Sequence, residues 1–376
     1  MSFMTKKRSA LFNLILIFCL FVAGVFFVFG WSQLTSFEYK SEEVLAKEKT
    51  LAQADKSIIL PKPEPLKLDK LAYDQKMIEL ANYPKSSSTA TTSVKSATTT
   101  VKAKLWPPKS AYPNGGALLP FNRIIAYYGN FYSKNMGILG ELPPEQMLAK
   151  LDLEVKKWQL ADPKTPVIPA IHYIAVTAQG SAGADGKYRL RMPKEQIDKA
   201  IVLAKKNNGI VFLDIQVGLS TLQSEIPALE PYLKLPQVHL GIDPEFSMKT
   251  GAKPGTVIGT FSATDINFAT NYLAKIVRDN NLPPKILIIH RFTQPMLTSY
   301  RQIVTVPEVQ IVINMDGWGP PAQKVGTYNN FIVPEPVQFT GFKIFYKNDL
   351  RPANSRLLSP TDLLKLKPRP IYIQYQ

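Results

Sequence analysis

Residues 238–246 read VHLGIDPEF, a stretch with the pattern of a buried β-strand that ends in acidic residues. Its apolar residues alternate with His239, Gly241 and Asp243, so an extended segment here has one apolar face and one face of polar or small residues. Pro244 has no backbone N–H and ends the pairing of a strand at that point. Acidic residues at the carboxyl end of a buried strand are typical of α/β barrels, which build their active sites there.

The rest of the chain repeats this pattern. Helical patterns separate the strand-length apolar runs and lie near 143–160, 193–207, 221–233, 264–280, 295–304, 321–332 and 359–366. The predicted strands are 124–128, 167–174, 210–216, 238–243, 286–291, 309–316, 342–346 and 371–375. Strands alternating with helices in this number predict a (β/α)8 TIM barrel lacking the last helix. An open doubly wound sheet is the alternative, but the first strand is not followed by the glycine-rich turn that such sheets often carry.

The N-terminal part of the chain predicts a membrane anchor. Residues 10–31 are almost wholly apolar, and a helix of this length spans a bilayer core. Lys6, Lys7 and Arg8 precede the span and keep residues 1–9 cytoplasmic, which makes the barrel extracytoplasmic. We therefore expect a single-pass protein of the cell membrane with a retained signal anchor; a cleaved signal peptide is the alternative.

A tether is expected between the anchor and the barrel. Residues 38–82 mix charged and apolar residues and favour a stalk or a short amphipathic helix, and residues 86–104 are rich in Ser and Thr. The second stretch cannot bury enough apolar area to become ordered, so it predicts a flexible linker. We assign residues 32–104 to the stalk and linker and 105–376 to the barrel domain.

Charge and cysteine content exclude several classes of function. The net charge is +16, but the basic residues are spread along the chain, which argues against a nucleic-acid partner. Cys19 is the only cysteine, so the barrel has no disulfide, no cysteine zinc site and no cysteine nucleophile. The serine-hydrolase pattern Gly-x-Ser-x-Gly is absent as well. We expect no cofactor and assign no metal ligands.

Strand parity predicts which polar side chains meet at the barrel mouth. Asp214, Asp243, Glu245, His290 and Asp316 fall on inward positions at or just beyond the carboxyl ends of their strands. Lys343 is also inward and is expected to pair with Asp316 or Asp214. The residues expected to bind substrate are Tyr128, His172, Gln216, His290, Asn314, Asp316, Trp318, Lys343 and Tyr346.

The pair Asp243 and Glu245 carries the chemistry. Two carboxylates two residues apart on an extended segment lie on the same face of it. Like charges at that separation raise the pKa of one of the two carboxyl groups. Phe246 adds desolvation. A carboxylic acid that stays protonated near neutral pH is what protonating a glycosidic oxygen requires.

This strand ending resembles that of chitinase-type and lysozyme-type barrel glycosidases. The resemblance implies that Glu245 is the general acid and that Asp243 is a carboxylate that positions the substrate's acetamido group. The chitinase signature has further aspartates where this chain has Val238 and Gly241. Asp214 on the preceding strand is the candidate for a second catalytic carboxylate.

The chain also resembles a largely uncharacterised family of membrane- or lipid-anchored bacterial envelope proteins. The similarity runs from about Ile124 to Gln376 and is carried by the segments 240–246, 290–292, 315–317 and 368–372. It implies a (β/α)8 barrel at the cell envelope and no particular reaction.

Three functions follow from these patterns. The first is a glycoside hydrolase acting on a cell-envelope or extracellular polysaccharide, and the second is a non-catalytic barrel that binds cell-wall glycan. The third is a metal-dependent hydrolase with Asp214, Asp243, Glu245 and His290 as ligands, which ranks last because no His-x-x-x-His spacing supports it. Arg189 and the neighbouring Arg191, in the loop 175–192, either meet an anionic glycan or are solvated.

Overall fold

The computed structural model describes residues 67–84 and 104–376, which belong to one compact unit, Pro65–Gln376. The predicted cytoplasmic N-terminus (1–9), the predicted membrane anchor (10–31) and most of the Ser/Thr-rich linker lie outside the described residues. Among the helices of the described part, none has the length and apolar character needed to cross a membrane.

Eight parallel strands form a closed barrel. Each strand pairs with its neighbour in parallel, and β1 pairs with both β2 and β11, which closes the ring. The predicted barrel is therefore confirmed. The strands are β1 (Arg123–Gly129), β2 (Val167–Ala178), β4 (Ile210–Ile215), β5 (Val238–Ile242), β7 (Lys285–Arg291), β9 (Val309–Met315), β10 (Phe339–Ile344) and β11 (Tyr372–Tyr375).

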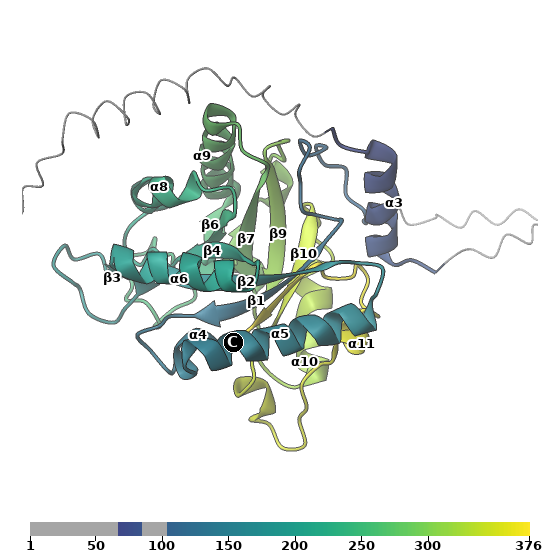
Figure 1. Ribbon diagram of the computed structural model, residues 1–376. Coiled ribbons are helices and arrows are strands. Elements are labelled where there is room, and N and C mark those ends of the chain that lie inside the picture. Colours follow the sequence, from purple (N-terminus) through teal and green to yellow (C-terminus); the bar gives the residue numbers. More distant parts are fainter. Residues whose placement is uncertain (1–66, 85–103) are drawn as a thin grey trace, which may run out of the picture. The chain divides into compact units, whose positions relative to one another are not determined.

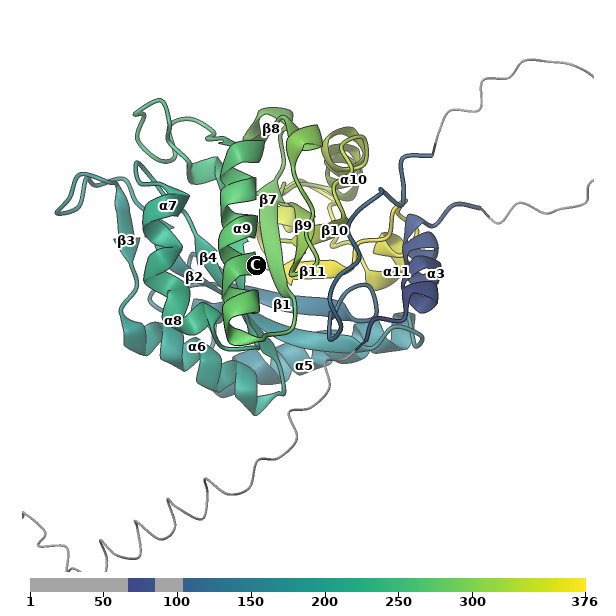
Figure 2. The same ribbon diagram turned by 90° about the horizontal axis from the view of Figure 1, so that it is seen from above.

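Helices cover the outside of the strands (Figures 1 and 2). The long ones are α5 (Pro144–Ala161), α6 (Lys194–Lys206) and α9 (Ala263–Asn280), and the short ones are α4 (Ile138–Glu141), α7 (Leu222–Glu225), α8 (Glu230–Leu233), α10 (Pro321–Thr327) and α11 (Pro360–Leu363). Pro144 at the first position of α5 and a Ser262–Asp265 capping box at α9 explain why these helices begin where they do.

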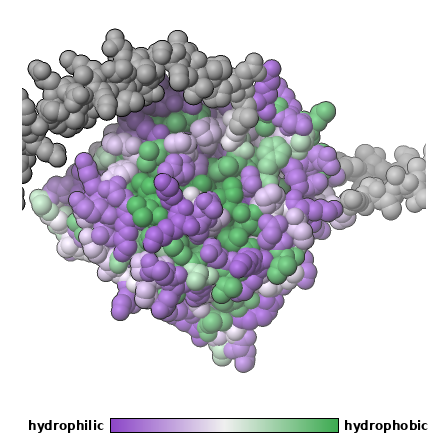
Figure 3. All heavy atoms as spheres, in the orientation of Figure 1, coloured by the Kyte–Doolittle hydropathy of each residue, from purple (hydrophilic) through white to green (hydrophobic). Residues whose placement is uncertain are grey.

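The strand residues are buried on both faces, and the alternation read from the sequence matches the hydrophobic cluster to which each of them belongs. Leu213, Leu240 and Ile289 belong to the large cluster between strands and helices, while Phe212 and Ile288 belong to the cluster inside the barrel. On the face seen in Figure 3, hydrophobic residues are grouped towards the centre and hydrophilic residues surround them.

The predicted helix 295–304 is wrong. A 3-10 turn spans Gln294–Met296, Leu297–Thr298 then forms a short strand, β8, that pairs with β6 (Phe261–Ser262), and a second 3-10 turn follows at Tyr300–Gln302. Ser299 adopts a left-handed conformation with φ 56°, which an α-helix does not accommodate.

Three other elements differ in extent. The predicted helix 221–233 is broken into α7, a 3-10 turn and α8, since Pro227 and Pro231 remove helical N–H donors. Strand β10 begins before Phe342 and ends at Ile344. The predicted loop after the second strand instead extends β2 to Ala178 and folds back as β3 (Arg189–Arg191).

A helix from the predicted stalk packs on the barrel. Helix α3 (Lys70–Ala81) contributes Tyr73 and Met77 to the cluster that fills the amino-terminal end of the barrel, together with Leu119. Asn82 donates hydrogen bonds to the carbonyls of Leu364 and Leu366, at 3.3 and 2.8 Å. The compact unit therefore extends further towards the N-terminus than the predicted boundary at residue 105.

Candidate active site

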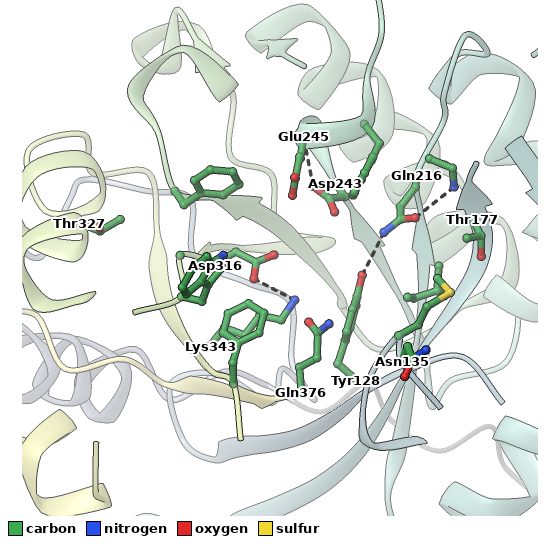
Figure 4. Close-up of a pocket in the computed structure, with 18 of the residues that line it drawn as sticks. Tyr128, Asn135, Thr177, Gln216, Asp243, Glu245, Asp316, Thr327, Lys343 and Gln376 are labelled. Carbon is green, nitrogen blue, oxygen red and sulfur yellow. Dashed lines mark hydrogen bonds and ion pairs between the residues drawn. The ribbon is translucent and has the colours of Figure 1, made fainter. Parts of the chain in front are cut away.

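A pocket of about 690 Å³ opens at the carboxyl ends of the strands (Figure 4). Its polar lining comes from seven strands or the segments that follow them, which is the arrangement that barrel active sites share. Polar residues of the lining include Tyr128, Gln216, Asp243, Glu245, Asp316, Lys343 and Gln376, and the aromatic ones include Phe246, Phe292, Trp318 and Phe345.

Asp243 and Glu245 enter the pocket from the end of β5. Asp243 follows the strand directly, and its Oδ1 accepts a hydrogen bond from the Glu245 amide at 3.0 Å. This contact caps a single 3-10 turn that starts at Pro244 and fixes where Glu245 stands. Asp243 is buried and Glu245 is partly exposed.

Asp316 and Lys343 form an ion pair on the opposite wall. Asp316 follows β9, and its Oδ1 lies 2.8 Å from Nζ of Lys343 on β10. Its Oδ2 lies 2.8 Å from Nδ1 of His290 on β7. The sequence prediction that Lys343 pairs with Asp316 is confirmed. Figure 4 shows Asp316 and Lys343 facing the same cavity as Glu245.

A second buried group lies beneath the pocket, around Asp214. Nε2 of His172 and of His290 lie 3.2 and 3.4 Å from Asp214 Oδ1. Tyr128, which lines the pocket, donates its hydroxyl to Asp214 Oδ2 at 2.9 Å. His172, Asp214 and His290 are 0% exposed, so they meet below the pocket and do not line it.

The acidic groups have different pKa values. Burial raises the pKa of Glu245 to about 7, with a further contribution from the Asp316 charge, while Lys343 and His290 oppose the rise. Burial also raises the pKa of Asp243 well above its ordinary value. Burial alone would raise the pKa of Asp316, but Lys343 and His290 outweigh it and hold that pKa below its usual value. The pocket thus combines protonated and ionised carboxyl groups.

The two histidines beside Asp214 also differ. Burial lowers the pKa of His172 to about 4, against the opposing effect of Asp214. At His290 burial acts in the same direction, but Asp214 and Asp316 outweigh it and raise the pKa to about 10.

Most predicted site residues come together, and Tyr346 does not. Its hydroxyl lies 3.0 Å from that of Tyr127, and its ring stacks on Tyr375 in the layer between strands and helices. Asn314 is buried beside His290 and lies below the pocket. Gln216 lines the pocket and donates to the Tyr128 hydroxyl at 3.4 Å.

The two arginines of the β2–β3 hairpin are engaged within the protein. Arg189 and Arg191 donate to the buried carboxylate of Glu225 at 2.8 and 2.7 Å, and Ser220 donates to the same group at 2.6 Å. This contact ties the hairpin to α7. Arg189 is largely buried by this contact, whereas the Arg191 side chain stays 47% exposed, so the solvated role suggested by the sequence describes Arg191 in part.

Several lining residues were missed by sequence reasoning. Phe292 and Phe345 follow strands directly, and Gln376 continues the inward parity of the last strand. Phe292 lies two residues after His290 and Phe345 two residues after Lys343, so the shared inward parity is the signal that could have found the two phenylalanines. Asn135 and Thr177 lie in segments with no recognisable pattern.

Three ligand-type atoms lie close enough together to hold a metal ion. They belong to His172, Asp214 and His290, and no two of them are more than 4.8 Å apart. Only His290 and Asp214 belong to the ligand set named from the sequence.

In comparisons with known proteins, no protein-family model and no curated protein matches the chain.

Proposed function

We propose that the protein is a glycoside hydrolase acting on a cell-envelope or extracellular polysaccharide, with Glu245 as general acid and Asp243 as the positioning carboxylate. The observation that carries the proposal is the shared pocket: Glu245 and Asp243 on one wall face Asp316 and Lys343 on the other. Carboxyl groups on two sides of one cavity are what glycosidic cleavage needs.

The assignment of roles follows the environments of the carboxyl groups. A general acid must hold its proton at the working pH, and the pKa of Glu245, at about 7, allows this. Asp316 is held ionised by Lys343 and is suited to stabilise positive charge that develops on the sugar ring. Asp243 uses Oδ1 to hold the Glu245 amide and keeps its other oxygen for the substrate. Asp214 lies beneath Tyr128, so its proposed part is to orient that hydroxyl.

Aromatic side chains support a carbohydrate ligand. Trp318 is 48% exposed and lines the pocket with Phe292 and Phe345. Exposed aromatic faces provide flat apolar surfaces against which sugar rings stack, with polar groups beside them for the hydroxyls.

Hydrolysis of a panel of envelope and extracellular glycans tests the proposal. The wild type is expected to release oligosaccharides from at least one glycan, and Glu245→Gln is expected to lower the rate at least 100-fold because the proton donor is gone. Glu195→Gln, an exposed change on α6, is the matched control and should keep the wild-type rate. Binding without hydrolysis by the wild type would instead favour the non-catalytic glycan-binding barrel.

We further propose that residues 10–31 anchor the chain in the cell membrane with the barrel outside. The apolar run and the basic residues before it support this arrangement. Protease added to intact cells should digest the barrel while residues 1–9 stay protected. Release of the barrel into the medium would instead indicate a cleaved signal peptide.

A further inference from the structure

We infer that His172, Asp214 and His290 form a binding site for a divalent first-row transition metal ion of the Zn²⁺ type, directly beneath the pocket. Two imidazoles and one carboxylate are a ligand set that holds such ions in proteins. The site lies beneath the carboxyl groups of the proposed glycan hydrolysis and shares with that proposal Asp214, which there orients the Tyr128 hydroxyl.

Two of the three distances between the ligand atoms suit one shared ion, and the third, between the two ring nitrogens, is at most 4.8 Å. Atoms that bind the same ion at about 2.0–2.2 Å lie about 3–3.5 Å from one another. Asp214 Oδ1 is 3.2 Å from His172 Nε2 and 3.4 Å from His290 Nε2. The three residues come from the neighbouring strands β2, β4 and β7, with β5 between the last two.

Within the described residues, the same three atoms have no well-formed hydrogen bond. His172 Nε2, His290 Nε2 and Asp214 Oδ1 are all buried, and both ring nitrogens approach the oxygen, at 3.2 and 3.4 Å, without the geometry of a hydrogen bond. Buried polar atoms without a partner are costly and rare. Coordination of one ion would satisfy all three atoms at once.

His290 and Asp214 are held from their other side in the way that metal ligands usually are, whereas Nδ1 of His172 accepts a hydrogen bond from the Gln374 side-chain amide at 3.1 Å. Asp316 contacts Nδ1 of His290 at 2.8 Å, which leaves Nε2 as the ligand atom. Nδ1 of His172 lies 2.6 Å from the Tyr372 hydroxyl, and the Tyr128 hydroxyl donates to the second oxygen of Asp214. These contacts fix the orientation of all three side chains.

Gly241 leaves the room that the cluster occupies. A Cβ atom at this position would lie 2.3 Å from Asp214 Oδ1 and 2.4 Å from His172 Nε2, closer than non-bonded atoms approach. The glycine of the VHLGIDPEF stretch therefore serves the cluster beneath the pocket. A bound ion would replace the proton on His290, because an imidazole nitrogen must be deprotonated to act as a ligand.

Direct metal binding tests the inference. The purified full-length chain is treated with chelator, given Zn²⁺ or Co²⁺, desalted and analysed for bound metal and for the visible absorption of Co²⁺. The wild type should retain one ion per chain, and the visible absorption of the Co²⁺ form should be that of an ion with a low coordination number. His172→Gln and His290→Asn should weaken binding at least 100-fold.

His239→Gln is the matched control. His239 is the remaining histidine of the chain, is buried inside the same barrel, and contacts the Ile286 amide instead of Asp214. The control should bind one ion with wild-type affinity. Absence of a stoichiometric ion in the wild type, or equal binding by the His172 and His290 variants, would overturn the inference.

A second measurement covers the case in which the variants fail to fold. X-ray absorption of the Zn²⁺-loaded wild type should show two imidazole ligands and oxygen, and any other ligand set would contradict the site. The result is independent of glycan hydrolysis: a protein that binds the ion and cleaves nothing refutes the proposed function alone, and one that cleaves glycan without binding an ion refutes this inference alone.

Discussion

Replacing Glu245 by Gln should stabilise the protein at pH 8 and not at pH 4.5. The pKa of Glu245 is raised from 4.5 to about 7, chiefly by burial and then by the Asp316 charge. A carboxyl group whose pKa is higher in the folded state contributes its full share of stability below about pH 4.5, and that share is lost as the pH rises through about 7. The glutamine of the variant stays uncharged at every pH, so the variant does not lose stability as the pH rises through about 7.

The magnitude follows from the size of the pKa change. A rise from 4.5 to about 7 is equivalent to about 3 kcal/mol, at about 1.4 kcal/mol per pKa unit. Glu245 is partly exposed, and Lys343 and His290 already oppose the rise, so solvent and relaxation reduce the expected gain to about 1–2 kcal/mol. Asp243 is the other carboxyl group beside Glu245, and burial raises its pKa and so favours its neutral form as well.

Urea unfolding at several pH values measures this gain. The difference in the free energy of unfolding between Glu245→Gln and wild type should grow by about 1–2 kcal/mol from pH 4.5 to pH 8. The same difference for the exposed Glu195→Gln control should vary by less than about 0.5 kcal/mol. A difference for Glu245→Gln that does not change with pH would refute the reasoning, whatever the substrate proves to be.

Three other changes have expected outcomes. Lys343→Met removes one of the two cationic partners of the buried Asp316, leaving His290, and should cost about 3 kcal/mol in chemical unfolding, whereas Lys347→Met, at an exposed pair, should cost less than about 1 kcal/mol; equal costs would contradict the buried ion pair. Glu225→Gln should release the β2–β3 hairpin and speed its cleavage in limited proteolysis, and an unchanged cleavage rate would show that the two arginines do not hold it. Trp318→Ala should weaken glycan binding roughly 3–10-fold in calorimetry without changing the melting temperature, since the ring is largely exposed; unchanged binding would remove it from the sugar-binding surface.

The barrel could be predicted because strand parity is a local property of the sequence. In VHLGIDPEF and in the strand that holds Asp214, every second residue packs against the helices, and the residues between them face the barrel interior. Strand parity was therefore enough to predict that Asp214, Asp243 and Asp316 lie at one end of the barrel, and the structure of the loops was not needed. The same rule would have excluded Tyr346, which has the opposite parity to Lys343.

The remaining features depend on contacts between distant segments. The cluster of His172, Asp214 and His290 requires the ring to close in a particular register, and the sequence does not reveal that register. Helix α3 packs on the barrel through Tyr73 and Met77, two apolar residues in a charged segment that also fits an exposed stalk. The run 295–304 has helical spacing, but its pairing with Phe261–Ser262 is set by a segment far along the chain.

The role of Glu245 as proton donor is tested most directly by comparing two leaving groups. Once the glycan that the wild type cleaves is known, Glu245→Gln is assayed on it and on the dinitrophenyl glycoside of the same sugar, whose leaving group needs no proton. Because only the first reaction requires a general acid, the variant should lose at least 100-fold in kcat/KM on the glycan and less than about tenfold on the activated glycoside. Equal losses on both substrates, or no loss on either, would contradict the assignment of Glu245 as the general acid.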